Sequence, residues 1–143
     1  MLPEKTREQF EKVVESQLAR IQAMKDQGDF VDYSKLDKII IGVCGGDGIG
    51  PMITSMAQHL LETLLADKVK AGKVEFCVID GLTIERRAEV GCAIPPDVME
   101  ELKACHVILK GPTTTPRKGD PWPNVESANV AMRKALDLFA NVR

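Results

Sequence analysis

The chain has 143 residues, with 19 Lys and Arg against 21 Asp and Glu and a formal net charge of −2. Hydrophobic residues make up 44% of it and charged residues 28%, a globular composition that excludes disordered, collagen-like and disulfide-scaffold proteins. The balanced charge offers no basic surface for nucleic acid and no polybasic patch for a membrane, so we expect neither partner. This length allows one domain with a substantial core.

The longest apolar run, residues 39–44, is far shorter than the roughly 20 residues that span a bilayer. The N-terminus begins with alternating charges and lacks the apolar core of a signal peptide. Four cysteines show no C-x-x-C pair and fit small buried hydrophobic residues in a reducing compartment: Cys44, Cys77, Cys92 and Cys105. We therefore expect a cytoplasmic protein without a zinc or disulfide site.

Residues 3–27 are predicted to form one amphipathic helix, with Pro3 in its first turn and Gly28 at its end. Its apolar stripe recurs at three- and four-residue steps: Phe10, Val13, Val14, Leu18, Ile21 and Met24. Such a stripe packs on its own domain or on a partner chain, and the first is the commoner case. With the polar linker that follows, this segment is predicted to cover residues 1–37, separate from an α/β region at 38–143.

From residue 38 onward, predicted strands alternate with predicted helices. The strands cover residues 39–44, 73–79 and 106–109. The helices follow at 53–65, from Pro95 or Pro96 to Leu102, and at 127–138. Strands that alternate with helices indicate parallel βαβ units with right-handed crossovers, so the predicted fold class is α/β with a parallel sheet and an extra N-terminal helix.

A glycine-rich turn joins the first strand to its helix, with the sequence Gly45-Gly46-Asp47-Gly48-Ile49-Gly50-Pro51. Closely spaced glycines before a helix N-terminus let a ligand approach the backbone, but they also build tight strand-to-helix turns. The spacing matches neither the Rossmann nor the phosphate-loop pattern, because Pro51 stands where neither has proline. A Rossmann fold is therefore not predicted, and the two interpretations of the turn remain open.

Two further segments follow at the ends of secondary-structure elements. Lys110-Gly111-Pro112-Thr113-Thr114-Thr115-Pro116 comes directly after the third strand, where open α/β sheets bind ligands, although an ordinary polar loop has the same composition. Ser127 begins the last helix, where it could serve as an N-cap. Asn129 and Arg133 are four residues apart and share one helix face. Hydroxyl, amide and guanidinium groups there would suit a substrate with several carboxylates, or belong to a capped surface helix. The histidines, His59 and His106, have no partners spaced for a catalytic triad.

Taken in order, these segments resemble the isocitrate/isopropylmalate dehydrogenase family over about residues 38–143. The likeness runs through the glycine turn, the 91–101 region, the Lys110–Pro116 segment, Ser127-x-Asn129-Val130-x-x-Arg133-Lys134, and Leu136-Asp137-Leu138-Phe139-Ala140-Asn141-Val142-Arg143. Ten residues separate Pro116 from Ser127, which is unusual for the family, and they include the lone Trp122.

The resemblance implies a partial fold of an enzyme that uses NAD or NADP and Mg²⁺ or Mn²⁺ to oxidise and decarboxylate a 2-hydroxy acid. It implies that Ser127, Asn129, Arg133 and Arg143 bind substrate carboxylates. Thr114, Thr115, Asn129 and Ile49 are implied to lie on the cofactor side. The Ser-x-Asn pair resembles the isocitrate branch, since the isopropylmalate branch places apolar residues there.

The family's further arginine, its catalytic tyrosine and lysine, its metal-binding aspartates and its adenine-binding loop have no counterpart in this sequence. The resemblance therefore implies that the metal ligands lie outside this chain. We expect the N-terminal part of an isocitrate dehydrogenase-like enzyme, truncated or split from a complementary chain, inactive alone and homodimeric when complete. The alternative is a non-catalytic regulatory or binding subunit of a dehydrogenase complex.

Overall fold

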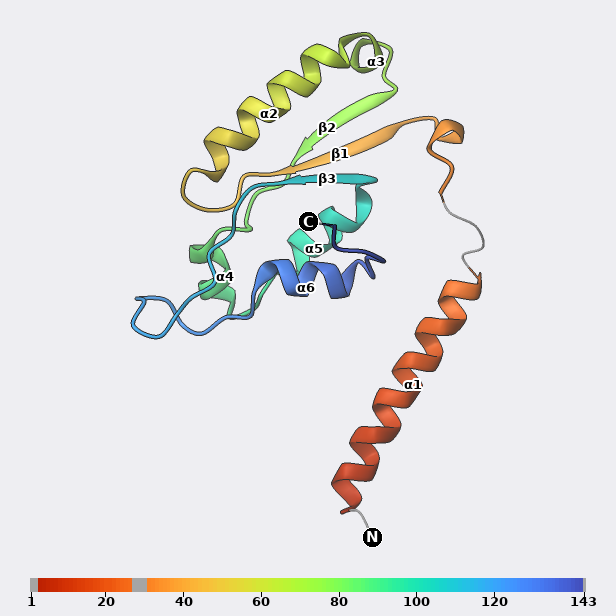
Figure 1. The fold of residues 1–143 in the computed structure, drawn as a ribbon, viewed down its shortest axis with the longest axis vertical. Coiled ribbons are helices and arrows are strands. Elements are labelled where there is room, and N and C mark those ends of the chain that lie inside the picture. The colour runs from red at the N-terminus through yellow and green to blue at the C-terminus, as the bar shows by residue number, and fades with distance from the viewer. Residues whose placement is uncertain (1–2, 27–30, 143) are drawn as a thin grey trace. The chain divides into compact units, whose positions relative to one another are not determined.

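The computed structural model describes residues 3–26 and 31–142 (Figure 1). The chain divides into two compact units, Met1–Lys35 and Leu36–Arg143. No helix in the described ranges is both long and apolar enough to cross a membrane.

The first unit consists mainly of α1 (Glu4–Asp26), which confirms the predicted N-terminal helix. The amides of Thr6 and Arg7 donate to the carbonyl oxygen of Pro3, and Glu4 and Lys25 complement the helix dipole at its two ends. None of the described residues of α1 is buried, its apolar stripe included. The predicted stop at Gly28 lies outside the described residues. A single 3₁₀ turn, η1 (Tyr33–Lys35), completes the unit.

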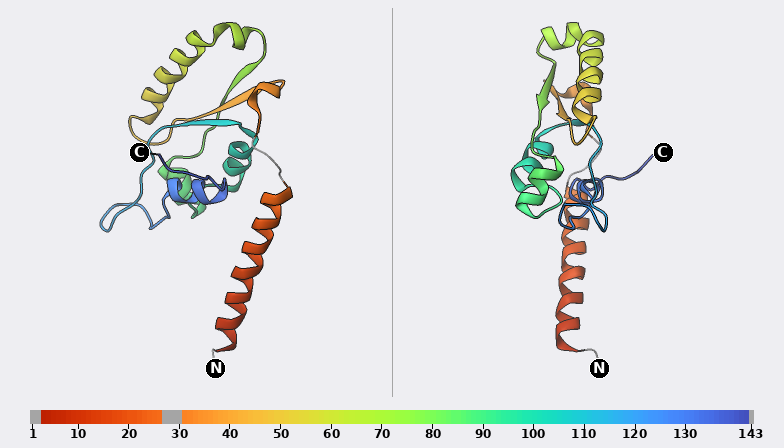
Figure 2. Two further views of the ribbon diagram at one scale, coloured as in Figure 1. Left: turned by 45° about the vertical axis from the view of Figure 1, so that its right-hand side comes forward. Right: turned by 90° about the vertical axis from the view of Figure 1, so that its left-hand side faces the viewer.

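The second unit is built on a parallel three-stranded sheet, which confirms the predicted α/β class and all three strands (Figures 1 and 2). The strands are β1 (Ile39–Cys44), β2 (Val74–Val78) and β3 (Val107–Lys110), and their order is β2-β1-β3. The β-branched run of β1 occupies the centre because a strand with neighbours on both sides and helices on both faces is buried along most of its length.

Three helices were predicted and are confirmed: α2 (Gly50–Leu64), α5 (Pro96–Ala104) and α6 (Ala128–Ala135). The predicted extension of the last helix to Leu138 is wrong. Asp137 adopts a positive φ of 47°, and the amide of Leu138 donates to the carbonyl of Arg133, so the helix closes in a left-handed cap. Two short helices were not predicted, α3 (Ala66–Lys70) and α4 (Ile84–Val90).

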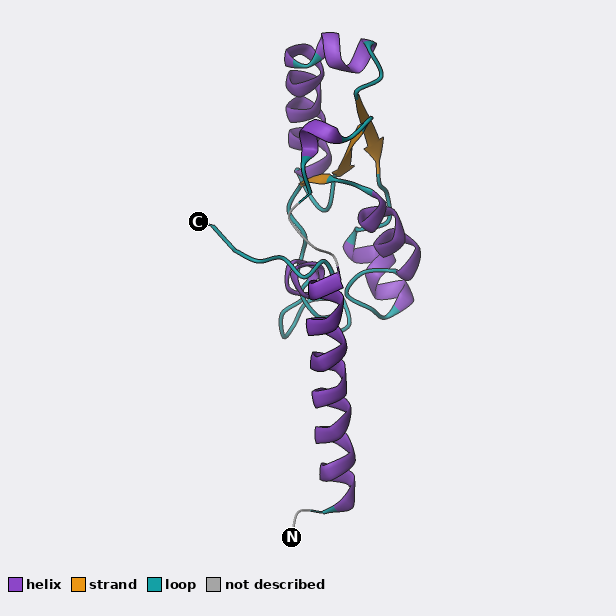
Figure 3. Ribbon diagram, turned by 90° about the vertical axis from the view of Figure 1, so that its right-hand side faces the viewer, coloured by secondary structure: helices purple, strands orange, loops and turns teal. Residues whose placement is uncertain are grey.

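The two faces of the sheet are covered by different helices (Figure 3). Val43 of β1 faces α2, since both line one hollow, whereas Gly42 contacts Cys105 and Ile79 on the opposite face. The main core lies on that opposite face, beneath α5 and α6: Cys44, Ile79, Leu82, Ile94, Val98, Leu102, Ala128 and Met132. This core fixes the N-terminus of α6 against the carboxyl ends of the strands.

Candidate functional site

The glycine turn after β1 is packed against the segment that follows β3. Gly46 has a φ of +72°, and a Cβ at this position would lie 2.1 Å from the carbonyl oxygen of Pro112. A Cβ at Gly111 would lie 2.0 Å from the carbonyl oxygen of Gly45. The two backbones therefore approach each other where only glycine fits. This contact supports the tight-turn interpretation, because the backbone of the segment after β3 fills the space that a phosphate would need beside Gly46.

Asp47 joins the same two segments through its carboxylate. Its Oδ1 accepts a hydrogen bond of 2.7 Å from the amide of Ile84, and its Oδ2 accepts one of 2.6 Å from the amide of Thr114. The amide of Asp47 in turn donates to the carbonyl of Pro112 at 2.8 Å. Charge-assisted bonds of this length are among the stronger hydrogen bonds in proteins. Asp47 therefore fixes both the start of α4 and the backbone of the Lys110–Pro116 segment, which we call the threonine loop.

Arg87 in α4 is fully buried and makes three hydrogen bonds, all to backbone carbonyls. Its Nε donates to Ala93 at 2.7 Å, its Nη1 to Thr114 at 2.8 Å and its Nη2 to Glu126 at 2.9 Å. Burial lowers the pKa of this guanidinium, and the nearby Asp47 carboxylate opposes that shift. One side chain thus brings Thr114 beside Glu126, the residue that precedes Ser127.

Lys110 ends β3 and is half-buried. Its Nζ donates to the carbonyl of Gly111 at 2.8 Å and to the Thr113 hydroxyl at 3.0 Å. Burial is the main cause that lowers the pKa of the Lys110 ammonium. The side chain lines a hollow of about 510 Å³ together with Met132 and Leu136. Lys110 therefore stabilises the first turn of the threonine loop.

The N-terminus of α6 carries three of the predicted substrate residues. Ser127 is the N-cap residue, half-buried, and its hydroxyl makes no capping hydrogen bond. Asn129 is exposed, and its backbone carbonyl oxygen accepts a hydrogen bond of 3.0 Å from Arg133 Nε, so the two residues share a helix face. Among the described residues, Arg133 has no ion-pair partner, so both terminal nitrogens of its guanidinium are available. A hydroxyl, an amide and a guanidinium thus lie within two turns of helix.

The other predicted site residues lie outside α6. Thr114 is half-buried and Thr115 is exposed, and neither hydroxyl makes a hydrogen bond within the described part of the chain. Ile49 is 66% exposed at the N-cap of α2. Arg143 lies outside the described residues.

The cysteines and histidines take structural or exposed positions. All four cysteines are free thiols, and burial raises the pKa of Cys44 to about 11. Nδ1 of His106 accepts a hydrogen bond of 3.0 Å from the amide of Ile40, whereas His59 is exposed. Within residues 3–26 and 31–142, no group of three or more His, Cys, Asp or Glu side chains is arranged to hold a metal ion.

Sequence reasoning missed Asp47 and Arg87, which hold this region together. Asp47 carried a usable signal, because an acid inside a glycine turn has backbone amides within reach. Arg87 carried none, since it stands in the charged run Glu85-Arg86-Arg87, which has the composition of a solvated helix face.

Comparisons with known proteins identify the family to which this chain is similar. A profile of the isocitrate/isopropylmalate dehydrogenase family matches residues 40–143. The chain is 37% identical over 110 residues to the isocitrate dehydrogenase (NADP) of Caldococcus noboribetus, covering 75% of this chain and 24% of that protein. It is 32% identical over 105 residues to the 3-isopropylmalate dehydrogenase of Anaeromyxobacter dehalogenans, covering 72% of this chain and 29% of that protein.

A solved structure is similar as well. The apo form of a beta-decarboxylating dehydrogenase from Thermococcus kodakarensis matches with a TM-score of 0.54 and 32% identity, over 69% of this chain and 27% of that one. These matches define the class as decarboxylating dehydrogenases, which are oxidoreductases. The chain belongs to the isocitrate/isopropylmalate dehydrogenase family. It spans about a quarter of the length of the curated relatives it matches.

The family uses NAD(P) and a divalent metal, and the residues present fit these groups unequally. The Thr114 and Thr115 hydroxyls are donors and acceptors that suit the carboxamide end of a nicotinamide cofactor. At Gly46 the glycine turn does not fit a pyrophosphate, because this position is packed against the backbone of Pro112. The described residues do not fit the metal either, since a hard divalent cation needs clustered carboxylates.

Proposed function

We propose that this chain supplies the substrate-carboxylate side and the nicotinamide side of the active site of an NAD(P)- and metal-dependent oxidative decarboxylase of a 2-hydroxy acid. The observation that carries the proposal is the set of three hydrogen bonds from the buried Arg87 side chain to the carbonyls of residues 93, 114 and 126, which we call the Arg87 clamp. It holds the threonine loop beside the N-terminus of α6, within a chain of the matching family. Groups from residues 114–115 and 127–133 are thereby presented together.

The roles follow from the chemistry of each group. The free guanidinium nitrogens of Arg133 can form two parallel hydrogen bonds with one carboxylate. The Ser127 hydroxyl, which makes no capping hydrogen bond, and the Asn129 side-chain amide can bind a second carboxylate. The arginine and these polar groups would fix the alcohol carbon relative to the hydride acceptor, and this positioning is the chain's share of the catalysis. The bound cofactor supplies the hydride acceptor.

Isocitrate is the proposed substrate. Isocitrate carries three carboxylates, which the Ser127 hydroxyl and the Asn129 amide can help to bind. The alkyl substituent of 3-isopropylmalate would leave these two polar groups without hydrogen-bond partners. The relatives include both isocitrate and 3-isopropylmalate dehydrogenases, so the choice between these substrates rests on the residues alone.

A chimera tests the function. Residues 38–143 replace the matching segment of the Caldococcus noboribetus enzyme, and NADP⁺ reduction is measured with Mg²⁺ and either isocitrate or 3-isopropylmalate. We expect turnover with isocitrate preferred, and a loss in kcat/KM of about 30-fold or more in Arg133→Ala, as expected for the loss of one partner of a buried charge pair. Lys134→Ala is the matched control, since this neighbouring cation is exposed and pairs with Glu126.

Three results would contradict the proposal: an inactive but folded chimera, a preference for 3-isopropylmalate, or an Arg133→Ala variant with unchanged KM and kcat. The 143-residue chain itself should give no turnover under the same conditions. If it instead copurifies with a complete dehydrogenase and changes that enzyme's activity, the regulatory-subunit alternative is favoured.

A further inference from the structure

Both backbone polar groups of Thr114 are held by charged side chains of opposite sign. Its amide donates to Asp47 Oδ2 at 2.6 Å, and its carbonyl oxygen accepts from Arg87 Nη1 at 2.8 Å. Charge-assisted hydrogen bonds of this kind are roughly twice as strong as neutral ones. The backbone of Thr114 is therefore fixed on both sides, while its hydroxyl makes no hydrogen bond in the described part of the chain.

These contacts form a closed ring through helix α4. Asp47 Oδ1 accepts a hydrogen bond of 2.7 Å from the amide of Ile84, the first residue of α4. Arg87 lies three residues further along the same helix, and its guanidinium returns to the carbonyl of Thr114. Asp47 therefore acts on Thr114 twice, directly through the amide and indirectly through the helix that carries Arg87.

The two charged side chains of this ring reach different parts of the site. Within residues 31–142, the Asp47 carboxylate accepts hydrogen bonds from the amides of Ile84 and Thr114. Arg87 holds Thr114 as well, but it also donates to the carbonyl of Glu126, just before α6. Asp47 thus contacts the threonine loop, whereas Arg87 contacts both the threonine loop and the segment that leads into the substrate residues of α6.

We propose that Asp47 is a positioning residue for the cofactor, which sets the orientation in which Thr114 and its neighbour Thr115 meet the nicotinamide carboxamide. This inference rests on the proposed function. A threonine whose amide and carbonyl are both held has little more than its side-chain rotation to lose on binding, so less conformational entropy opposes the contact. Removing the Asp47 carboxylate would return backbone freedom to the loop and weaken cofactor binding, while the groups on α6 keep their positions.

Steady-state kinetics of the chimera with the Caldococcus noboribetus enzyme test this role. Asp47→Ala should raise the KM for NADP⁺ by about tenfold, the order of effect of one lost hydrogen bond, and change the KM for isocitrate by less than about twofold. Arg87→Lys is the contrasting variant. It loosens both the threonine loop and the start of α6, so both KM values should rise.

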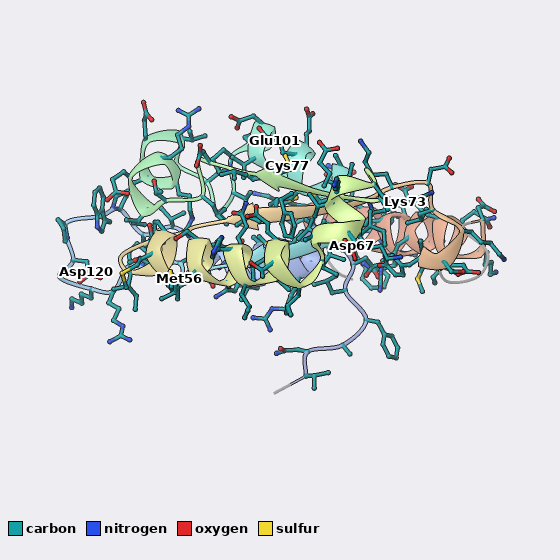
Figure 4. The ribbon with its side chains drawn as sticks, turned by 90° about the horizontal axis from the view of Figure 1, so that it is seen from above. Met56, Asp67, Lys73, Cys77, Glu101 and Asp120 are labelled. Carbon is teal, nitrogen blue, oxygen red and sulfur yellow. The ribbon has the colours of Figure 1, made fainter. Side chains whose placement is uncertain are left out.

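Asp120→Ala is the matched control. The Asp120 carboxylate also accepts a loop amide, that of Arg117 at 2.8 Å, and Asp120 is exposed. In Figure 4, Asp120 lies at the outer end of its loop, away from the strands. Its removal should leave both KM values unchanged.

The KM values separate positioning from a merely structural role. If Asp47 only stabilises the fold, Asp47→Ala lowers the folded fraction and the apparent kcat, but the folded molecules keep both KM values, and the proposal is overturned. Equal rises in the two KM values, or a rise for isocitrate alone, overturn it as well. If Asp47→Ala does not fold, Asp47→Asn decides, since it keeps one acceptor oxygen: its KM for NADP⁺ should rise about threefold or more, and an unchanged value overturns the proposal.

Calorimetric titration of NADP⁺ into the same chimeras measures the Kd without turnover. A folded chimera that does not turn over isocitrate contradicts the proposed function. In that case a Kd about tenfold higher in Asp47→Ala than in the parent chimera still supports the positioning role, and an unchanged Kd overturns it. A chimera that binds no NADP⁺ overturns both proposals.

Discussion

Removing the Arg87 guanidinium should destabilise the second unit strongly. Arg87→Ala deletes three hydrogen bonds of 2.7–2.9 Å from one charged, fully buried donor group. Hydrogen bonds to charged groups contribute about 1.5–3 kcal/mol each, so the low end of that range gives about 4–5 kcal/mol for three. Glu126 is an exposed residue whose carbonyl water can reach once the side chain is gone. We therefore expect a loss of about 3–4 kcal/mol in the free energy of unfolding.

Urea denaturation followed by far-ultraviolet circular dichroism measures this loss. The fluorescence of Trp122 reports separately on the loop between the two clamped carbonyls, and it should shift in the variant before global unfolding begins. Arg86→Ala is the control. Arg86 is the neighbouring arginine and is exposed, and among the described residues its ion-pair partners are Glu89 and Asp97. Such surface pairs contribute less than about 1 kcal/mol.

The reasoning is refuted if Arg87→Ala costs no more than Arg86→Ala. It is also refuted if Arg87→Lys, which keeps the charge but not the fork of donors, is as stable as the parent chain.

Three further predictions concern the strand ends. Asp47→Ala leaves two amides without their acceptor and should cost about 2–4 kcal/mol in urea denaturation, with Asp47→Asn intermediate because it keeps one acceptor oxygen. Burial raises the pKa of Cys44 from 9.0 to about 11, so the stability that the neutral thiol contributes below pH 9 is lost as the pH rises toward 11, by at most about 3 kcal/mol. The free energy of unfolding, measured from pH 9 to 11, should therefore fall less steeply with pH in Cys44→Ala than in the parent chain. Gly46→Ala would place a Cβ against Pro112 and should cost more than about 3 kcal/mol, whereas Gly48→Ala meets open space and should cost only the roughly 1–2 kcal/mol of a left-handed backbone; equal shifts in melting temperature would contradict the proposed close approach.

The parts of the fold that depend on local pattern could be predicted from the sequence. The β-branched run of β1 and the helical repeat of α2 each carry their own periodicity, and both elements are confirmed. Helix α4 was missed although Thr83 caps its start and Gly91 ends it in a left-handed conformation. Seven residues between those signals are too few for a helical repeat to stand out.

The parts that depend on distant contacts could not be predicted. Arg87 is buried only because three carbonyls from residues 93, 114 and 126 converge on it, and no local pattern records that convergence. The apolar residues of α2 likewise predicted a helix but not the direction in which its stripe faces. Hydrophobic periodicity identifies a face that should be covered and leaves open what covers it.

The Arg87 clamp also changes what the intervening loop is free to do. Because one guanidinium fixes the carbonyls of Thr114 and Glu126, the loop between them has closed ends, as an Ω-loop does. Lengthening such a loop costs only about 0.6 kcal/mol for each doubling, so residues can be added or exchanged at its tip without displacing Ser127. The ten residues between Pro116 and Ser127 are thus a place where evolution can alter specificity while the positions of the binding groups are preserved.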